Sequence, residues 1–119
     1  MFGFLRFLVL GSLITFTVAS QATHEVDHRY KIFGQVQKTD GAPAAKATVK
    51  LTGIGGRPIG ETVTDESGNY EFSLHVHNQQ LGTRFWVTVN KMTREGAFTF
   101  EPSDKTTERI HRIDLPPRD

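Results

Sequence analysis

Apolar and polar residues alternate with a period of two through most of the chain after residue 23. Successive side chains of a strand point to opposite faces of a sheet, so each alternating stretch predicts a strand with one face on a core. No stretch has a sustained helical period. The alternating stretches are 30–36, 47–52, 70–77, 85–90, 97–101 and 110–115, with a weaker one at 59–64.

Turn-forming residues separate these stretches. Gly, Pro, Asn and Asp mark positions where a chain reverses, because they tolerate or impose turn dihedral angles. Seven short strands at this spacing favour an all-β sandwich. The predicted turns and connections are 39–43, 53–58, 78–82, 93–96 and 101–107, and Pro116-Pro117 stops the last strand.

The stretch DESGNYEF, residues 65–72, has the composition of a hairpin turn followed by a core strand. Asp65 can accept hydrogen bonds from backbone amides of its own turn, and Gly68 can take a positive φ. Tyr70 and Phe72 then enter the core on one face. The acidic residues here lack the alternating ligand pattern of an EF-hand loop. We therefore interpret the stretch as structural.

The first 22 residues resemble a secretory signal peptide. Arg6 precedes the apolar run 7–18, and small residues follow, which is the order of such a leader. Cleavage is expected before Thr23, with cleavage before Gln21 as the alternative. The other interpretation, an uncleaved membrane anchor, requires ~20 apolar residues, and this run is shorter. We expect a signal peptide at 1–22, an N-terminal extension at 23–29 and a domain at 30–116.

The composition limits which cellular compartment and which classes of binding partner fit the chain. The chain has no cysteine, which excludes disulfides, thiolate metal ligands and a lipid-modified cysteine. Arg6 is the one charged residue of 1–22, so 13 of the 14 basic side chains remain after cleavage, against 13 acidic ones. A balanced charge favours neither nucleic acid nor an anionic membrane. We expect a secreted or periplasmic protein without a membrane span after cleavage.

Three motifs in residues 30–76 together resemble the carboxypeptidase regulatory-like domain. They are GQV at 34–36, DGAPAAKATVKL at 40–51 and TDESGNYEF at 64–72. The resemblance implies a seven-stranded transthyretin-like (prealbumin-type) Greek-key β-sandwich, a carbohydrate-binding-like fold related to collagen-adhesin B-type repeats. It also implies that the motif residues form turns and core. These residues are Asp40, Gly41, Pro43, Asp65, Gly68, Tyr70 and Phe72.

Two groups of relatives of that family have covalent or catalytic chemistry of their own. Some collagen-adhesin-type domains form an isopeptide bond from a Lys in the first strand to an Asn or Asp in the last. Lys31 and Asp114 have the required chain order, but alternation places Lys31 outward, and Glu61 is the nearest analogue of the assisting Glu. The transthyretin-like hydrolases end in a Y-R-G-S motif, which this chain lacks. We expect no enzyme and no cofactor.

Histidines offer one candidate site. His75 and His77 are two apart on a predicted strand and therefore share a face, a spacing that can chelate copper or zinc. Cleavage before Thr23 would place His24 second in the mature chain, where the free amine could share copper. Solvent-facing histidines at a strand edge are the plainer interpretation. Metal binding is thus the alternative function.

The single tryptophan offers another candidate site. By alternation Trp86 shares a face with Arg84, Thr88 and Asn90, opposite to Phe85 and its neighbours. An aromatic plane beside such groups can stack on a sugar ring and hydrogen-bond its hydroxyls. Phe33 is expected to join this patch. The alternative is that a loop, the segment 23–29 or another subunit covers the face.

These observations predict a non-catalytic binding or interaction module outside the cytoplasm. The expected partner is a glycan on the Trp86 face, or an envelope or extracellular protein. A purely structural domain that docks through an unpaired strand edge is a further alternative. The sequence names neither the ligand nor the oligomeric state.

Overall fold

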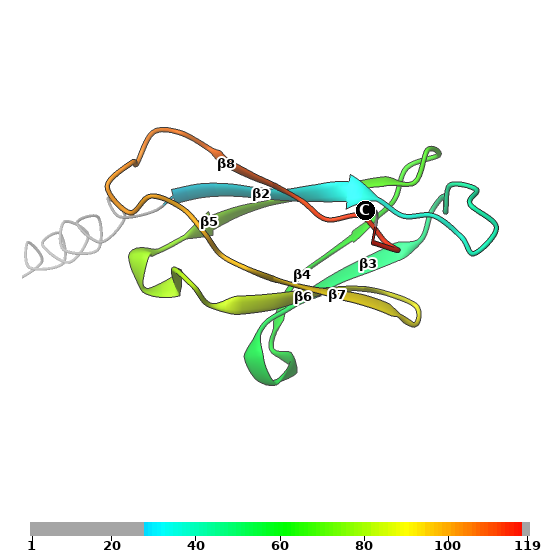
Figure 1. The fold of residues 1–119 in the computed structure, drawn as a ribbon, viewed down its shortest axis with the longest axis horizontal. Helices are drawn as coiled ribbons and strands as arrows, with labels where there is room; N and C mark the ends of the chain where they lie inside the picture. Colours follow the sequence, from blue (N-terminus) through cyan, green and yellow to red (C-terminus); the bar gives the residue numbers. More distant parts are fainter. Residues whose placement is uncertain (1–27, 118–119) are drawn as a thin grey trace, which may run out of the picture.

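A computed structural model describes residues 28–117, which form two β-sheets packed face to face (Figure 1). The predicted signal peptide and His24 lie outside the described residues. The strands are β2 (His28–Gln35), β3 (Thr48–Thr52), β4 (Pro58–Val63), β5 (Asn69–Val76), β6 (Arg84–Val89), β7 (Met92–Ala97) and β8 (Arg109–Arg112), with short 3-10 helices η3 (Ile54–Gly56) and η4 (Asn78–Gln80). The all-β sandwich expected from the period of two is therefore observed.

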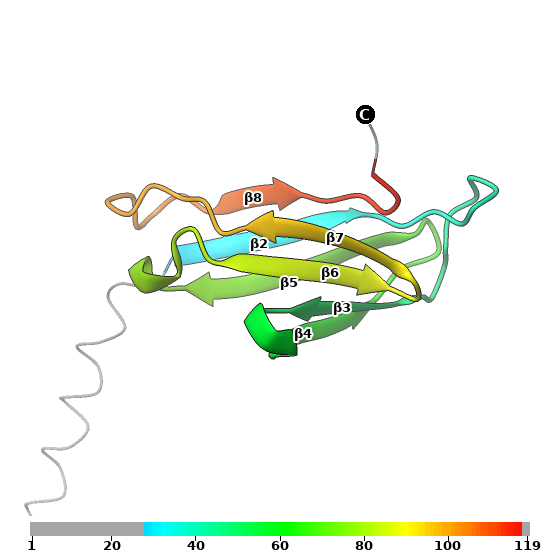
Figure 2. The same cartoon turned by 60° about the horizontal axis from the view of Figure 1, so that its bottom comes forward.

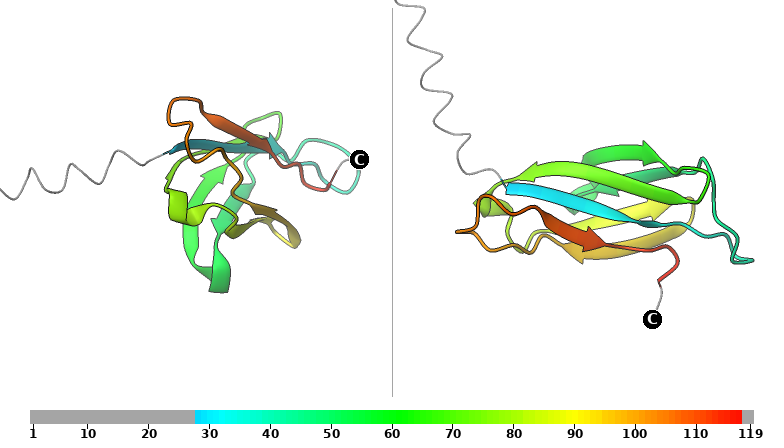
Figure 3. Two further views of the ribbon diagram at one scale, coloured as in Figure 1. Left: turned by 60° about the vertical axis from the view of Figure 1, so that its left-hand side comes forward. Right: turned by 90° about the horizontal axis from the view of Figure 1, so that it is seen from above.

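Each sheet contains strands that are distant in sequence. One sheet has the order β5-β2-β8 and the other the order β4-β3-β6-β7. Strands β2 and β8 are parallel, whereas the remaining pairs are antiparallel. Figure 3 shows the three-stranded layer over the four-stranded one. Strand β2 begins at His28, earlier than the domain boundary expected at residue 30.

The core lies between the two sheets and is built from the inward positions of the alternating strands. In β6, Phe85, Val87 and Val89 are buried, and the residues between them are not. Burying such side chains contributes about 1.5–3 kcal/mol each. The core consists of Tyr30, Ile32, Val36, Val49, Leu51, Tyr70, Phe72, Val76, Phe85, Val87, Val89, Phe98, Ile113 and Leu115.

The structure places the stretch 65–72 in a tight turn and a buried strand. The Asp65 carboxylate accepts hydrogen bonds from the amides of Ser67 and Asn69, each at 2.9 Å. Gly68 has a φ of 81°, and a Cβ there would lie 2.5 Å from the Val36 carbonyl oxygen. A residue with a side chain would therefore meet both strain and a clash at this position.

The family-pattern residues of the earlier turn also lie where the chain reverses. The Asp40 carboxylate accepts a hydrogen bond of 2.9 Å from the Ala42 amide, and Gly41 has a φ of 90°. An isolated bridge then joins Pro43 to Gln37. Tyr70 and Phe72 enter the core side by side, with ring centroids 5.9 Å apart.

The prediction of a turn at 93–96 followed by a strand at 97–101 is wrong. Strand β7 covers Met92–Ala97, and the chain reverses earlier, at Asn90, whose φ is 53°. Gly96 does not form a turn. Its position needs a glycine because a Cβ there would lie 2.5 Å from the Phe85 ring. Phe98 is buried beyond the end of β7, where its amide bonds to the Thr83 carbonyl at 2.9 Å.

Candidate binding face on the four-stranded sheet

The outward side chains of β4, β3, β6 and β7 form one polar face around Trp86. Alternation in β6 turns Arg84, Trp86 and Thr88 outward, as predicted from the sequence. Strand pairing adds the outward residues of the neighbouring strands in two rows. The first row consists of Glu61, Lys50, Thr88 and Thr93. The second row, next to the first, consists of Pro58, Thr52, Trp86 and Glu95. In Figure 2 this face comes forward, and no described segment crosses it.

Trp86 is half-buried between its cross-strand neighbours and an adjacent arginine. Thr52 and Glu95 lie opposite it on β3 and β7. The guanidinium carbon of Arg84 is 6.0 Å from the ring centroid, and Arg84 Nη1 is 3.1 Å from Glu95 Oε2. The ion pair therefore holds the guanidinium over the indole ring, and the Trp86 side chain remains partly open to solvent.

A hollow of about 490 Å³ lies on the same face, over the row that contains Thr88, and Trp86 in the next row is not among its lining residues. Its lining residues are Thr48, Lys50, Glu61, Thr88 and Asn90. A second hollow, of about 470 Å³, shares Lys50 and Glu61 and continues past Thr52 to Gly56 and Pro58. We call the two together the β3 groove. Asn90, predicted to share the face of Trp86, lines this groove from the β6–β7 turn.

The polar side chains of the β3 groove are largely unengaged. Lys50 and Glu61 are exposed and lie in register on β3 and β4. Neither side chain makes a hydrogen bond or ion pair with another residue of 28–117, and the same holds for the amide of Asn90. Thr88 Oγ1 is 3.2 Å from Thr93 Oγ1. The groove thus presents an ammonium, a carboxylate and an amide that are available to hydroxyl groups.

Phe33 does not belong to this face, so its predicted grouping with Trp86 is wrong. It lies outward on β2, which is in the other sheet, and its ring is stacked by Arg112 at 5.6 Å. Alternation within a strand assigns a residue to a face of its own sheet. It does not say on which side of the sandwich that face lies.

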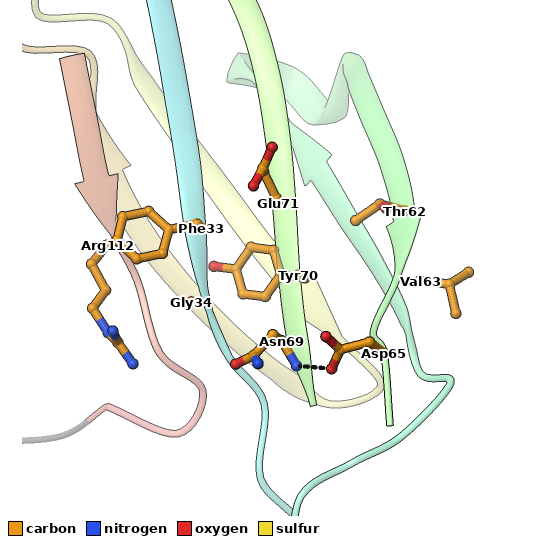
Figure 4. Close-up of a pocket in the computed structure, with 9 residues that line it drawn as sticks. All are labelled: Phe33, Gly34, Thr62, Val63, Asp65, Asn69, Tyr70, Glu71 and Arg112. Carbon is orange, nitrogen blue, oxygen red and sulfur yellow. Dashed lines mark hydrogen bonds between the residues drawn. The ribbon is translucent and has the colours of Figure 1, made fainter. Parts of the chain in front are cut away.

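A separate pocket of about 490 Å³ contains Phe33 and lies near the 65–72 turn (Figure 4). Its volume equals that of the first hollow of the β3 groove, so size does not distinguish the two. Its charged groups and its tyrosine hydroxyl, however, are already engaged, whereas the Thr62 hydroxyl and the Asn69 side-chain amide have no partner within residues 28–117. The Tyr70 hydroxyl donates to the Ile113 carbonyl at 2.5 Å, and Arg112 Nε lies 3.0 Å from Asp114 Oδ2.

Asp65 and Glu71 in the same pocket are also engaged. The Asp65 carboxylate holds its own turn, and Lys31 Nζ lies 3.8 Å from Glu71 Oε1. The charged groups of the pocket in Figure 4 are therefore paired or hydrogen-bonded, whereas Lys50 and Glu61 of the β3 groove are not paired with any described residue. For this reason the groove is the better candidate site.

The histidines occupy separate environments. His75 is exposed near the end of β5, and His77 follows that strand as the cap of η4. His28 is buried, with Nδ1 3.0 Å from the Asp104 carbonyl oxygen and Nε2 2.6 Å from Asn78 Oδ1. Within residues 28–117, no three His, Asp or Glu side chains are grouped to hold a metal ion. Binding by His75 and His77 stays a prediction.

The structure does not bring Lys31 and Asp114 together. Lys31 faces outward and pairs with Glu71, in agreement with its predicted orientation. Asp114 is buried, and its Oδ1 accepts a hydrogen bond of 2.8 Å from the Gln35 amide while Arg112 neutralises it. The carboxylate of Asp114 thus fixes the end of β2.

Sequence reasoning missed Lys50 and Glu61. The outward alternation of Thr48, Lys50 and Thr52 is visible in the sequence, but nothing local indicates that β3 pairs with β6. Glu61 lies in the weakest predicted strand, where the register shifts between Leu51 and Thr52. The groove therefore depends on pairings that join distant segments.

Comparisons with known proteins leave the family open. No protein-family model matches the chain, and no curated protein matches it significantly. Among solved structures, the TIE protein of Bacillus anthracis matches 73% of this chain and 17% of its own, with 13% identity and a TM-score of 0.49. BcpA, the major pilin subunit of Bacillus cereus, matches 72% of this chain and 28% of its own, with 15% identity and a TM-score of 0.48.

These similarities are too weak to support an inference about function, and they span less than a third of either neighbour. Among the helices of residues 28–117, none is long and apolar enough to cross a membrane.

Proposed function

We propose that the chain is a non-catalytic glycan-binding module that acts outside the cytoplasm, as a transthyretin-like sandwich. The observation that carries the proposal is the position of Trp86. The half-buried indole lies on a polar face that no described segment crosses (Figure 2), one row from a groove whose charged and amide side chains lack partners among the described residues.

An indole in this setting suits a sugar ring. The apolar face of a pyranose stacks on an aromatic plane, and its hydroxyls exchange hydrogen bonds with neighbouring polar side chains. The ion pair with Glu95 holds Arg84 over the indole and restrains the ring. A ring held before binding loses less conformational freedom when a ligand stacks on it.

The sheet connections support the transthyretin-like part of the proposal. After the β3–β4 hairpin in one sheet, the chain returns to the other sheet, where β5 pairs with β2. Such a return beside an earlier strand is typical of Greek-key connections. The leader-like residues 1–22 support export.

Replacing Trp86 with alanine tests the proposal. We expect Trp86→Ala to lose retardation in native gels that contain neutral polysaccharides such as amylose, xylan or mannan, because the stacking plane is gone. The wild-type tryptophan emission should shift with the same glycan. Trp86→Phe should retain part of the binding, since it keeps an aromatic plane.

Phe33→Ala is the matched control. It removes an aromatic side chain from the outer face of the opposite sheet and should bind as the wild type does. Retardation that persists in Trp86→Ala would contradict the proposal, and so would a wild type that no glycan retards. In the latter case, docking to an envelope protein becomes the function to test.

A further inference from the structure

We propose that Lys50 and Glu61 determine specificity in the β3 groove and select uncharged oligosaccharides over acidic ones. The inference rests on the proposed glycan-binding function and adds the class of glycan. It follows from the position and charge of these two side chains and from their lack of a hydrogen bond or ion pair within residues 28–117.

Lys50 and Glu61 lie at the centre of the β3 groove. Both hollows that make up the groove include them. The outward residues Thr48, Lys50 and Thr52 follow one another along β3. At about 3.3 Å per residue they span about 13 Å, which is room for a short run of sugar rings. A ligand that lies along β3 must pass over this pair.

The charges of the face compensate one another locally. Arg84 and Glu95 bond to each other beside Trp86. Lys50 and Glu61 face each other across β3 and β4, yet no ion pair joins them. A glycan hydroxyl can donate to the Glu61 carboxylate and accept from the Lys50 ammonium, so a neutral sugar satisfies both groups.

An acidic sugar would be repelled by the Glu61 carboxylate. A uronate carboxylate that approaches Lys50 also approaches Glu61, and like charges brought together cost binding free energy. The pair therefore excludes a polyanion that Lys50 alone would attract.

Removing the carboxylate tests the inference. We expect Glu61→Gln to gain retardation by polygalacturonate, because Lys50 is then uncompensated, and to lose it again in high salt. Binding to a neutral glycan should weaken about tenfold in Glu61→Gln, because a charge-assisted hydrogen bond is lost. Lys50→Gln should weaken neutral binding similarly and gain nothing for polygalacturonate.

Glu71→Gln is the matched control, since it makes the same change in net charge on the outer face of the opposite sheet. Glu71→Gln should bind polygalacturonate and the neutral glycan as the wild type does. Far-UV circular dichroism and urea unfolding establish that each variant is folded.

The outcomes separate the inference from the proposed function. A gain for polygalacturonate in Glu61→Gln but not in Glu71→Gln supports the inference. Trp86-dependent binding that neither charge variant changes overturns the inference and leaves the proposed function standing. Wild-type binding to polygalacturonate as strong as to neutral glycans also overturns only the inference. A wild type that binds no glycan overturns both.

Discussion

At the scale of single residues, the close approach of another segment explains why position 34 is a glycine. A Cβ on Gly34 would lie 1.9 Å from the Ile113 carbonyl oxygen, because the chain after β8 continues alongside β2 and hydrogen-bonds to it here. The Tyr70 hydroxyl donates to that same carbonyl, at 2.5 Å. Burial, together with the nearby Asp114 carboxylate, raises the pKa of Tyr70 well above its ordinary value, so Tyr70 remains a donor into the alkaline range.

We expect Gly34→Ala to destabilise the protein by about 1–3 kcal/mol, the usual cost of overpacking a closed interior. Urea unfolding followed by Trp86 fluorescence measures the change. Gly53→Ala is the control, because a Cβ at Gly53 would lie 3.4 Å from its nearest atom, an ordinary contact. Equal midpoints for the two variants would contradict the close approach.

At the scale of elements, the β6–β7 hairpin shows how one residue fixes a strand boundary. Val89 pairs with Met92, so the loop consists of Asn90 and Lys91. Asn90 takes a φ of 53°, a conformation that asparagine tolerates better than most residues. The position of this turn sets the register of β7 against β6 and therefore which residues stand beside Trp86.

Substitutions at Asn90 should separate the turn from the groove. We expect Asn90→Ala to lose about 1 kcal/mol of stability, because alanine resists a positive φ. Asn90→Gly should keep or improve stability, and both variants should weaken neutral-glycan binding because the amide is lost. Urea midpoints and gel retardation measure the two effects.

Lys91→Ala serves as the comparison within the same loop. Lys91 is exposed and lacks a positive φ, so its replacement should change stability by less than about 0.5 kcal/mol. Equal stability of Asn90→Ala and Asn90→Gly would show that the backbone conformation at this position is not the reason for asparagine.

At the scale of the whole molecule, His111 links the two sheets. It lies on β8, its Nδ1 is 2.9 Å from the Tyr30 hydroxyl, and its ring is 5.6 Å from that of Phe85 in the opposite sheet. Burial lowers the pKa of His111 below its ordinary value of 6.5, and the charges of Arg109 and Arg94 lower it further. The folded protein therefore resists protonation of this imidazole.

The sign of the pH dependence follows from this lowered pKa. Below pH 6.5 the unfolded chain binds a proton at His111 more readily than the folded chain does. The contribution of His111 to stability is thus intact above that pH and declines as the pH falls through the lowered folded pKa. Urea midpoints between about pH 5 and 7.5 should decline less steeply in His111→Gln than in the wild type.

His75→Gln is the control for loss of an imidazole, because His75 is exposed near the end of β5. In His75→Gln, the urea midpoint should decline with falling pH as steeply as in the wild type. A His111→Gln variant with the wild-type slope would show that other groups cause the loss of stability in acid.

Much of the fold was predictable because strand alternation and turn chemistry are local. Trp86, Arg84 and Thr88 were correctly placed on one outward face, since a period of two within β6 needs no knowledge of other strands. The errors arose where a local signal had a distant cause. Gly96 was interpreted as a turn residue, although its missing side chain makes room for the Phe85 ring.

Local patterns in the sequence suffice for the all-β class, the inward and outward faces of most strands and the chemistry of the 65–72 turn. The pairing of distant strands places Phe33 across the sandwich from Trp86, and it places Lys50 and Glu61 in the row of Thr88, next to the row of Trp86. The physical reason is that alternation sets the direction of a side chain within its own strand. Which strands pair, and in which register, depends on contacts between segments far apart in the chain.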